Sequence, residues 1–431
     1  MAEAEPVMET IPTEFDYFES KAIQAAVIDE YDHYVIAPPV QDGNPIEFEI
    51  SSGHNLYRDL NNSKLEVKCK IVAADGTDIG DDVAVGPVNM MLHSMFNAVD
   101  MHLCDKKITS INTLYPYRAF METLLSYGKE VGKTRLLAEG WIRDTPGNLD
   151  DFVITDAGHN VGFKTRRALF RGSRMVTLIG RPHLDLFHQN LDIPPGCKMR
   201  LKFYPSPPNF FLKKPAALAD NFKLRILSAR LWVRTKMVSP NFLLAQETML
   251  RKHNFRIPFN MVEMKTASIT QGLTSIELDN IFTGTMPERV VIGLLPDACV
   301  NGASSANPFH FRHYDLCHVS LLVNHVQFPR QAYEPNFTTG DYIREYYGLS
   351  EGIGLDTGNK AIDLTPEEWA SSLPLFIFRL NPCGLPSLPQ VGAARLVLKF
   401  RTPTPNVITV MIFSEVPTIA EIDQYRNLIL A

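Results

Sequence analysis

Four residues near position 310 form the densest group of potential metal ligands in the sequence: His310, His313, Cys317 and His318. A zinc site needs three or four nitrogen or sulfur ligands that converge on one point. In an extended strand, residues an odd number of positions apart point to opposite faces, so His310 and His313 diverge, as do Cys317 and His318. We therefore predict histidines that pack in the core or at an interface, with no bound metal.

The sequence offers no complete catalytic motif. An Asp-Thr-Gly triplet at 356–358 resembles that of aspartic proteases, but this chemistry needs two aspartates that share a proton, and no second triplet exists. The glycines at 352, 354 and 358 miss the dinucleotide-binding spacing. Neither a Gly-x-Ser-x-Gly nucleophile nor a phosphate-binding Walker motif occurs. We predict a protein that is not an enzyme and needs no cofactor.

Composition excludes several other classes of protein. The 431 residues carry 42 Lys+Arg against 48 Asp+Glu, a net charge of −6, which argues against a chain built mainly to coat nucleic acid. Six cysteines lie far apart, which indicates buried thiols rather than a disulfide framework. The acidic N-terminus lacks the apolar run of a secretory signal, and no apolar stretch is long enough for a membrane span. We expect an unsecreted globular protein without membrane insertion.

Many short segments show the period of two that is typical of a half-buried strand. Residues 64–72, for example, alternate apolar and charged side chains from Leu65 to Ile71. Convincing helices are few, at 117–128 and at a short segment that begins at Thr365. The sequence therefore predicts an all-β protein with a few short helices in its loops. The other predicted strands are 99–104, 183–187, 198–203, 222–233, 289–295, 318–323, 375–380, 394–400 and 407–413.

A weak internal repeat divides the chain in two. The strand, turn and return strand at 99–108 resemble 317–326, and in each half a helical segment follows, at 117–128 and 339–348. Any all-β chain shows some such matches, but here the order of elements agrees over half the chain. Each half can bury its own core, and two tandem eight-stranded jelly rolls fit this size. We predict an N-terminal arm at 1–40, a first jelly roll at 41–240 and a second at 241–431.

Six blocks of residues stand out along the chain: GPVNMMLHSMFNAVDMHL (86–103), YPYRAFMETLLSYG (115–128), RDTPGNLD (143–150), IGRPHLDLFHQ (179–189), NPFHFRHYDL (307–316) and EIDQYRN (421–427). Together these blocks resemble one family, the major capsid proteins of Polinton/Maverick elements and adintovirus-like viruses. The similarity extends from about residue 30 to the C-terminus, in consistent order. Its specificity comes from the number and order of the blocks, since no single block contains a motif tied to a known mechanism.

The resemblance implies a double jelly-roll fold and a structural role. Three chains would form a homotrimer whose six barrels make a pseudo-hexagonal capsomer of an icosahedral shell. Its partners would be neighbouring capsomers, a minor or penton capsid protein and packaged DNA. The protein would reside in the virion capsid after assembly in the host cytoplasm or nucleus.

Two other classes of protein stay open. One is a jelly-roll carbohydrate-binding protein, and the other is a cupin-like metalloenzyme that would use His310 and His313. A minor vertex protein is a nearer alternative, but it would be expected to have a single jelly roll.

Two segments are candidates for contact with such partners. A basic run at 163–174 would contact DNA or an acidic partner, although a solvated hairpin also explains it. The arm carries aromatic residues that need a surface on which to be buried, either on a neighbouring subunit or on its own barrel. The candidate residues are Lys164, Arg166, Arg167, Arg171 and Arg174 of the basic run, and Phe15, Tyr17 and Phe18 of the arm.

Overall fold

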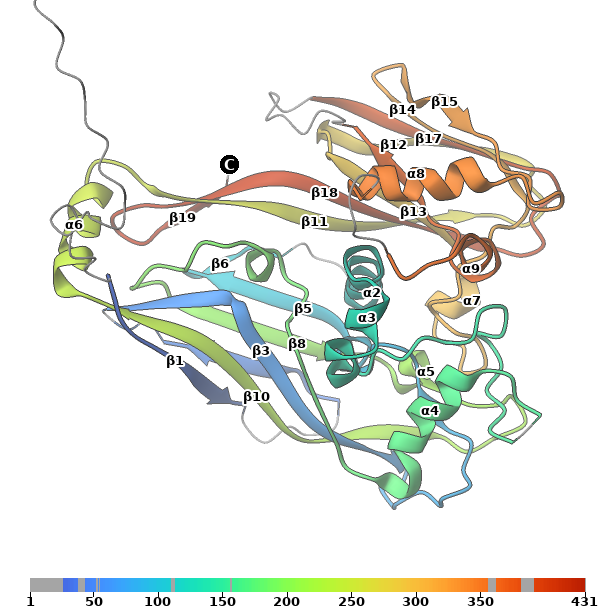
Figure 1. Ribbon diagram of the computed structural model, residues 1–431, viewed down its shortest axis with the longest axis horizontal. Helices are drawn as coiled ribbons and strands as arrows, with labels where there is room; N and C mark the ends of the chain where they lie inside the picture. The colour runs from blue at the N-terminus through green and yellow to red at the C-terminus, as the bar shows by residue number, and fades with distance from the viewer. Residues whose placement is uncertain are drawn as a thin grey trace, which may run out of the picture.

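Two β-barrels, each made of two facing sheets, lie one above the other in the computed structural model (Figure 1). The first barrel is formed by the N-terminal half of the chain and the second by the C-terminal half. Helix α6 (Pro240–Leu250) connects them at one end, and its first turn is capped by Ser239, whose Oγ accepts from the Phe242 N–H at 3.3 Å. The structure describes residues 26–37, 43–51, 53, 55–109, 113–155, 157–355, 362–380 and 391–430.

The first barrel has eight principal strands in two four-stranded sheets. Numbered from 1 to 8 along the chain, they are ordered 1-8-3-6 in one sheet and 2-7-4-5 in the other, and every neighbouring pair is antiparallel. This order is that of a jelly roll. The strands are β1 (Val27–Ile36), β2 (Ile46–Ile50), β3 (Leu56–Ala73), β5 (Phe96–Leu103), β6 (Lys106–Lys107), β7 (Val176–Gly180), β8 (Met199–Pro205) and β10 (Phe222–Val238).

The second barrel repeats this connectivity strand for strand. Its sheets are again ordered 1-8-3-6 and 2-7-4-5, and a short strand, β19 (Leu428–Leu430), is added to the first of them. The predicted repeat and the predicted pair of jelly rolls are therefore confirmed. The strands are β11 (Phe255–Ile269), β12 (Ser275–Thr285), β13 (Arg289–Pro296), β14 (Leu316–Val323), β15 (Val326–Tyr333), β16 (Phe376–Arg379), β17 (Val391–Phe400) and β18 (Ile408–Ile422).

The predicted alternation places side chains as expected in most strands. In β3, Leu65, Val67, Cys69 and Ile71 are buried between the sheets, while the residues between them lie on the wetter face. Cross-strand contacts fix the register; Trp232 of β10, for example, packs against Tyr34 of β1 with ring centroids 5.0 Å apart.

Strands β7, β11 and β12 form where no strand was predicted, and two further segments differ in kind from the sequence prediction. Residues 27–36, expected within the arm, form β1, which pairs with β10 at the edge of the first sheet. Residues 183–187, predicted as a strand, instead enter the turn η4 (Asp185–His188), because the adjacent side chains of Leu186 and Phe187 are both buried and the Asp185 carboxylate accepts from the Val262 N–H of the second barrel at 3.0 Å. The sixth strand of this barrel is β7.

Helices fill the connections between strands. The predicted helix at 117–128 is α2 (Tyr115–Ser126), and α8 (Ile343–Ile353) occupies the equivalent connection of the second barrel. The helix predicted at Thr365 is α9 (Pro366–Ser372), which begins with a capping box between Thr365 and Glu368. No helix in the described ranges is long and apolar enough to cross a membrane. The remaining short elements are α1 (Met91–Ser94), α3 (Lys129–Gly132), η2 (Arg135–Glu139), α4 (Val161–Leu169), η3 (Arg171–Ser173), α5 (Pro208–Phe211), α7 (Asp297–Val300), β4 (Gly86–Pro87) and β9 (Leu212–Lys213).

Candidate functional site: the junction between the two barrels

An aromatic cluster joins the cores of the two barrels. Phe309, from the long connection between β13 and β14, stacks on Phe120 of α2 with ring centroids 4.4 Å apart and planes 4° apart. Tyr117 of the same helix meets the Phe309 ring edge-on at 5.9 Å. All three residues are buried and belong to one hydrophobic cluster that extends through both halves of the chain. The barrels therefore share a core rather than touching only through polar surfaces.

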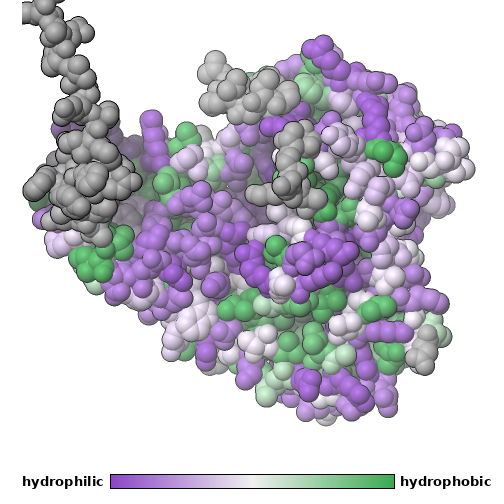
Figure 2. Space-filling view, viewed as in Figure 1, coloured by the Kyte–Doolittle hydropathy of each residue, from purple (hydrophilic) through white to green (hydrophobic). Residues whose placement is uncertain are grey.

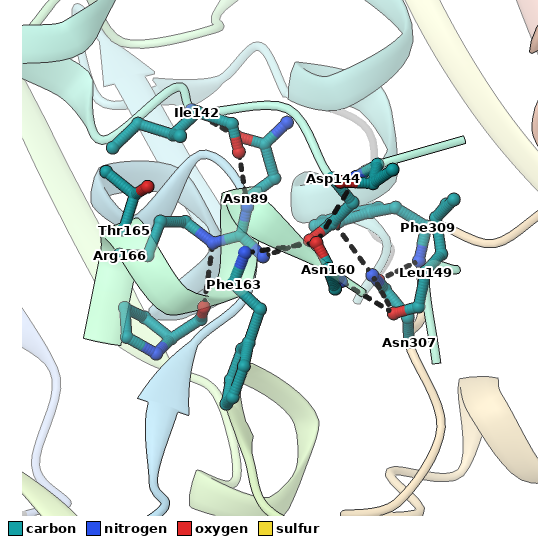
Figure 3. Close-up of polar contacts among 12 residues, drawn as sticks. Asn89, Ile142, Asp144, Leu149, Asn160, Phe163, Thr165, Arg166, Asn307 and Phe309 are labelled. Carbon is teal, nitrogen blue, oxygen red and sulfur yellow. Dashed lines mark hydrogen bonds and ion pairs between the residues drawn. The ribbon is translucent and has the colours of Figure 1, made fainter. Parts of the chain in front are cut away.

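Asn307 anchors the same connection to the first barrel (Figure 3). Its Nδ2 donates to the Asp144 carboxylate at 2.9 Å and to the Leu149 carbonyl at 3.2 Å, and its backbone N–H donates to Asp150 Oδ1 at 2.7 Å. Asn307 is fully buried, so each of these bonds replaces a lost contact with water. A buried side chain with all its donors paired fixes the position of the loop that carries it.

Ion pairs surround this buried amide. Asp150 accepts from His310 Nδ1 at 2.6 Å and lies 3.0 Å from Arg312 Nη2. Burial opposes ionisation of Asp150, but His310 and Arg312 lower the pKa of its carboxyl below the ordinary value. A third pair joins Arg143 to Glu368 of α9 at 3.3 Å. Two of the blocks on which the family resemblance rests, 143–150 and 307–316, thus contact each other at the junction.

Arg166 of the basic run points into the protein (Figure 3). Its Nε donates to the Pro87 carbonyl at 2.9 Å, and the rest of its guanidinium bonds to the Ile142 carbonyl and the Asp144 carboxylate. Only 1% of the residue is exposed. The Asp144 carboxylate therefore accepts hydrogen bonds from both Arg166 and Asn307. This arginine supports the junction and is not available to a partner.

The other four residues of the basic run lie nearer the surface. The run folds as α4 and η3, not as a hairpin; α4 begins where Asn160 Oδ1 accepts from the Phe163 N–H at 3.1 Å. The four side chains make local bonds or face solvent. Lys164 donates to the Gly158 carbonyl, Arg167 donates to the Val83 and Asp81 carbonyls, Arg171 pairs with Asp81 at 3.2 Å, and Arg174 is exposed.

The three histidines near position 310 have separate partners. His310 bonds to Asp150, while His313 stacks on Phe337 with centroids 4.1 Å apart. His318 lies 3.2 Å from Ser320 Oγ, and Cys317 is a partly buried free thiol. The histidines thus pack at the junction and in the second barrel. The Asp-Thr-Gly triplet at 356–358 and the arm residues Phe15, Tyr17 and Phe18 lie outside the described residues.

A histidine cluster that sequence reasoning missed lies beside the junction. His183 Nδ1 is 2.6 Å from Glu122 Oε2, and His188 Nε2 is 3.6 Å from the same oxygen. On the inner side, the ring of His93 packs edge-on to His183 at 4.7 Å, and its Nε2 lies 3.5 Å from Glu139. Its members come from α1, α2, η2 and the segment that follows β7 and ends in η4. These elements span almost a hundred residues, so no local motif marks the cluster.

The outer part of this cluster opens into a cleft of about 890 Å³ between the barrels. One wall carries Glu122, His183 and His188, and the other is formed by β11 and β18 of the second barrel. Partial desolvation at the cleft wall lowers the pKa of His188 below its ordinary value, although the side chain is 30% exposed. Burial also opposes ionisation of Glu122, but Arg118 and the neighbouring histidines lower its pKa below the ordinary value.

Lys213 of β9 is a further buried basic side chain at the junction. Its Nζ donates to the Asn209 carbonyl at 2.9 Å and, across the junction, to the Ala303 carbonyl at 2.8 Å. The residue is fully buried, and burial lowers its pKa to about 7. A neutral amine has two N–H donors, which matches the two carbonyls that face it.

This lysine should make stability depend on pH. Because the pKa is lower in the folded chain than in the unfolded one, the unfolded chain binds more protons between about pH 7 and pH 10, and stability rises with pH over that window. We expect a slope of up to about 1.4 kcal/mol per pH unit. Urea unfolding between pH 7 and 9 should show a steeper rise for the native protein than for Lys213→Met; parallel curves would contradict this assignment.

Comparison with known proteins identifies the fold. No family model matches the sequence. An uncharacterized protein of Caenorhabditis elegans is 22% identical over 404 residues, which cover 90% of this chain and 93% of that protein. Among solved structures, a chain of the Sputnik virophage matches with a TM-score of 0.62 and 11% identity over 100% of this chain and 94% of that one.

Two further matches are to proteins named as major capsid proteins. The Faustovirus major capsid protein has a TM-score of 0.57 and 9% identity, with 94% of this chain and 93% of that one covered. The mavirus major capsid protein has a TM-score of 0.52 and 12% identity, with 99% and 96% covered. The alignments span both barrels, and the chain has the double jelly-roll fold.

Proposed function

We propose that this chain is a major capsid protein, a structural subunit that assembles with copies of itself into a viral shell. The observation that carries the proposal is the pair of jelly rolls with identical strand order, joined by a shared core and similar over nearly their whole length to major capsid proteins. Two barrels held rigidly in one chain suit a building block, because the shape of the block then determines how neighbours meet.

The edges and surface of the first barrel support association. Strand β1 lies at the edge of its sheet and exposes large hydrophobic residues, of which Ile28 is 60% and Ile36 58% exposed. An exposed hydrophobic edge strand is a liability in a monomer, since it can pair with another chain. Figure 2 shows hydrophobic side chains gathered on the first barrel between α3 and α4, and exposed residues of this part of the chain include Leu137, Val161, Leu169 and Met175.

The finer parts of the proposal concern the assembly. Three chains would form a homotrimer whose six barrels make a pseudo-hexagonal capsomer, and capsomers would build an icosahedral shell. The resemblance of the sequence blocks favours the capsid proteins of Polinton/Maverick elements and adintovirus-like viruses. The partners would be neighbouring capsomers, a minor or penton capsid protein and packaged DNA, and the protein would be located in the virion after assembly in the host cytoplasm or nucleus.

The domain boundaries and the contact residues remain predictions. We place the arm before the first barrel, and the boundary between the barrels near residue 240, where α6 connects them. Of the basic run, Arg171 and Arg174 are the best placed to meet DNA or an acidic partner, because both are exposed. The aromatic residues of the arm keep their predicted role in contacts between subunits.

The mass of the purified protein in solution tests this proposal. Light scattering coupled to size exclusion should give about 146 kDa, three times the 48.5 kDa of one chain, or the much larger mass of closed shells. Obligate interfaces of this kind are large and apolar, so the trimer should persist on dilution and at high salt. A monomer that stays stable across pH and salt would contradict the proposal, and assays for glycan binding and metal-dependent activity would then test the alternatives.

A further inference from the structure

The outer part of the histidine cluster has the chemistry of a metal site. One ligand atom from each of Glu122, His183 and His188 lies within 4.8 Å of the other two. Glu122 Oε2 is 2.6 Å from His183 Nδ1 and 3.6 Å from His188 Nε2. Two imidazole nitrogens and one carboxylate oxygen make the donor set that zinc uses at sites with three protein ligands and one open position. We propose that Glu122, His183 and His188 bind one zinc ion at the wall of the cleft between the barrels.

The spacing of the ligand atoms is close to what zinc needs. With zinc–ligand distances of 2.0–2.1 Å, the donor atoms of a tetrahedral site lie about 3.3 Å apart. The separation of 3.6 Å between Glu122 Oε2 and His188 Nε2 already fits. The 2.6 Å between Glu122 Oε2 and His183 Nδ1 is a hydrogen bond that the ion replaces, as the two atoms move apart by about 0.7 Å. Any proton on His183 Nδ1 is released to solvent.

Neighbouring residues orient these ligands. Arg118 Nε donates to Glu122 Oε1 at 2.8 Å, which leaves Oε2 facing the histidines, and Arg118 itself is held by Asp185 at 2.7 Å. On the other nitrogen of the His183 ring, Nε2 lies 3.4 Å from Thr123 Oγ1. Metal-binding side chains are commonly positioned by such outer contacts.

The cleft gives an ion a way in and leaves room for a fourth ligand. All three ligands line the cleft, and the His188 side chain is 30% exposed at its wall. His93 and Glu139 also lie near His183, but both are buried, neither lines the cleft, and His93 Nδ1 is already bonded to the Tyr115 hydroxyl at 2.9 Å. One ion on the cleft side therefore uses His183, and a water molecule from the cleft completes its coordination.

A zinc ion here would tie α2 to the segment that follows β7. Glu122 is on α2, while His183 and His188 belong to that segment, and Asp185 between them bonds to the Val262 N–H of the second barrel. The ion would therefore brace the first barrel at the point where the second barrel rests on it.

The test is a zinc titration of the full-length, untagged protein after removal of metal with a chelator. We expect about one equivalent of zinc per chain and a tetrahedral visible spectrum when cobalt is used in place of zinc. His188→Ala should lower the affinity at least about tenfold. The matched control is His318→Ala, a histidine of the second barrel that lies 3.5 Å from Glu334 and should bind zinc like the native protein.

Two results would overturn the proposal: a native protein that binds no zinc in this titration, or a His188→Ala protein that binds it as the native protein does. Because His188 is partly exposed, its replacement should leave the fold intact, which circular dichroism checks. His188→Gln offers a second variant with a side chain of similar length. The result does not depend on the state of assembly, so it stands apart from the mass measurement.

Discussion

Replacing Arg166 with methionine should lower the free energy of unfolding by about 3–5 kcal/mol, the cost of leaving a buried charge without its partner. The buried Asp144 carboxylate would lose its cation, and the Pro87 and Ile142 carbonyls would lose their donor. Because Asp144 also holds Asn307, the loss should spread to the contact with the second barrel. Urea unfolding followed by tryptophan fluorescence measures the effect.

Arg171→Met is the matched control in the same basic run. Arg171 is 54% exposed and pairs with Asp81, which is also exposed, so its removal should cost less than about 1 kcal/mol. If both variants were equally stable, Arg166 would have no structural role. The Arg171 variant could also keep its stability but bind DNA more weakly than the native protein. The basic run would then combine one structural residue, Arg166, with a surface that contacts DNA.

Truncating Phe309 to alanine should be similarly costly, about 3–5 kcal/mol, because it leaves a cavity in a packed core. The ring is 1% exposed and stacks on Phe120, so the cavity would open in the cluster that joins the barrels. We expect the variant to unfold at lower urea concentration and its barrels to separate more readily, which protease cleavage within the connecting residues 240–250 would report.

Leu244→Ala serves as the control for Phe309→Ala. Leu244 lies on α6 and is 69% exposed, so its truncation should change stability by less than about 0.5 kcal/mol. The contrary result is a Phe309→Ala protein that matches the native protein in both its urea unfolding midpoint and its resistance to protease. That result would show that the aromatic cluster does not hold the barrels together.

Many strands could be predicted from sequence because one face is buried and the other wet, although β11 and β12 were not among the predicted strands. In β3 this produces strict alternation, and the order of such segments was enough to predict two similar barrels. Strand β1 was not predicted because nearly all of its residues are exposed on both faces, so no period of two appears in VIDEYDHYVI. Residues 183–187 were wrongly predicted as a strand, because apolar side chains at alternate positions also fit a turn that buries adjacent residues.

The junction was less predictable, because its contacts link residues far apart in the chain. His310 and Arg166 were both candidate site residues, but the sequence did not indicate their partners. Asp150 lies 160 positions from His310, and Asp144 lies 22 positions from Arg166. The cluster of Glu122, His183 and His188 is assembled by two connections of the first barrel. Periodicity describes one element at a time, so it predicts faces but not which loops meet.

Electron microscopy of the purified protein shows directly whether the chain assembles as a capsid subunit does. If the chain is a capsid subunit with two barrels, class averages of the smallest stable particle should show three chains around a threefold axis, with six barrels in a hexagonal outline. The same fractions should contain the mass of three chains, about 146 kDa. Particles that contain a single chain, or a ring with a different number of barrels, would contradict the account.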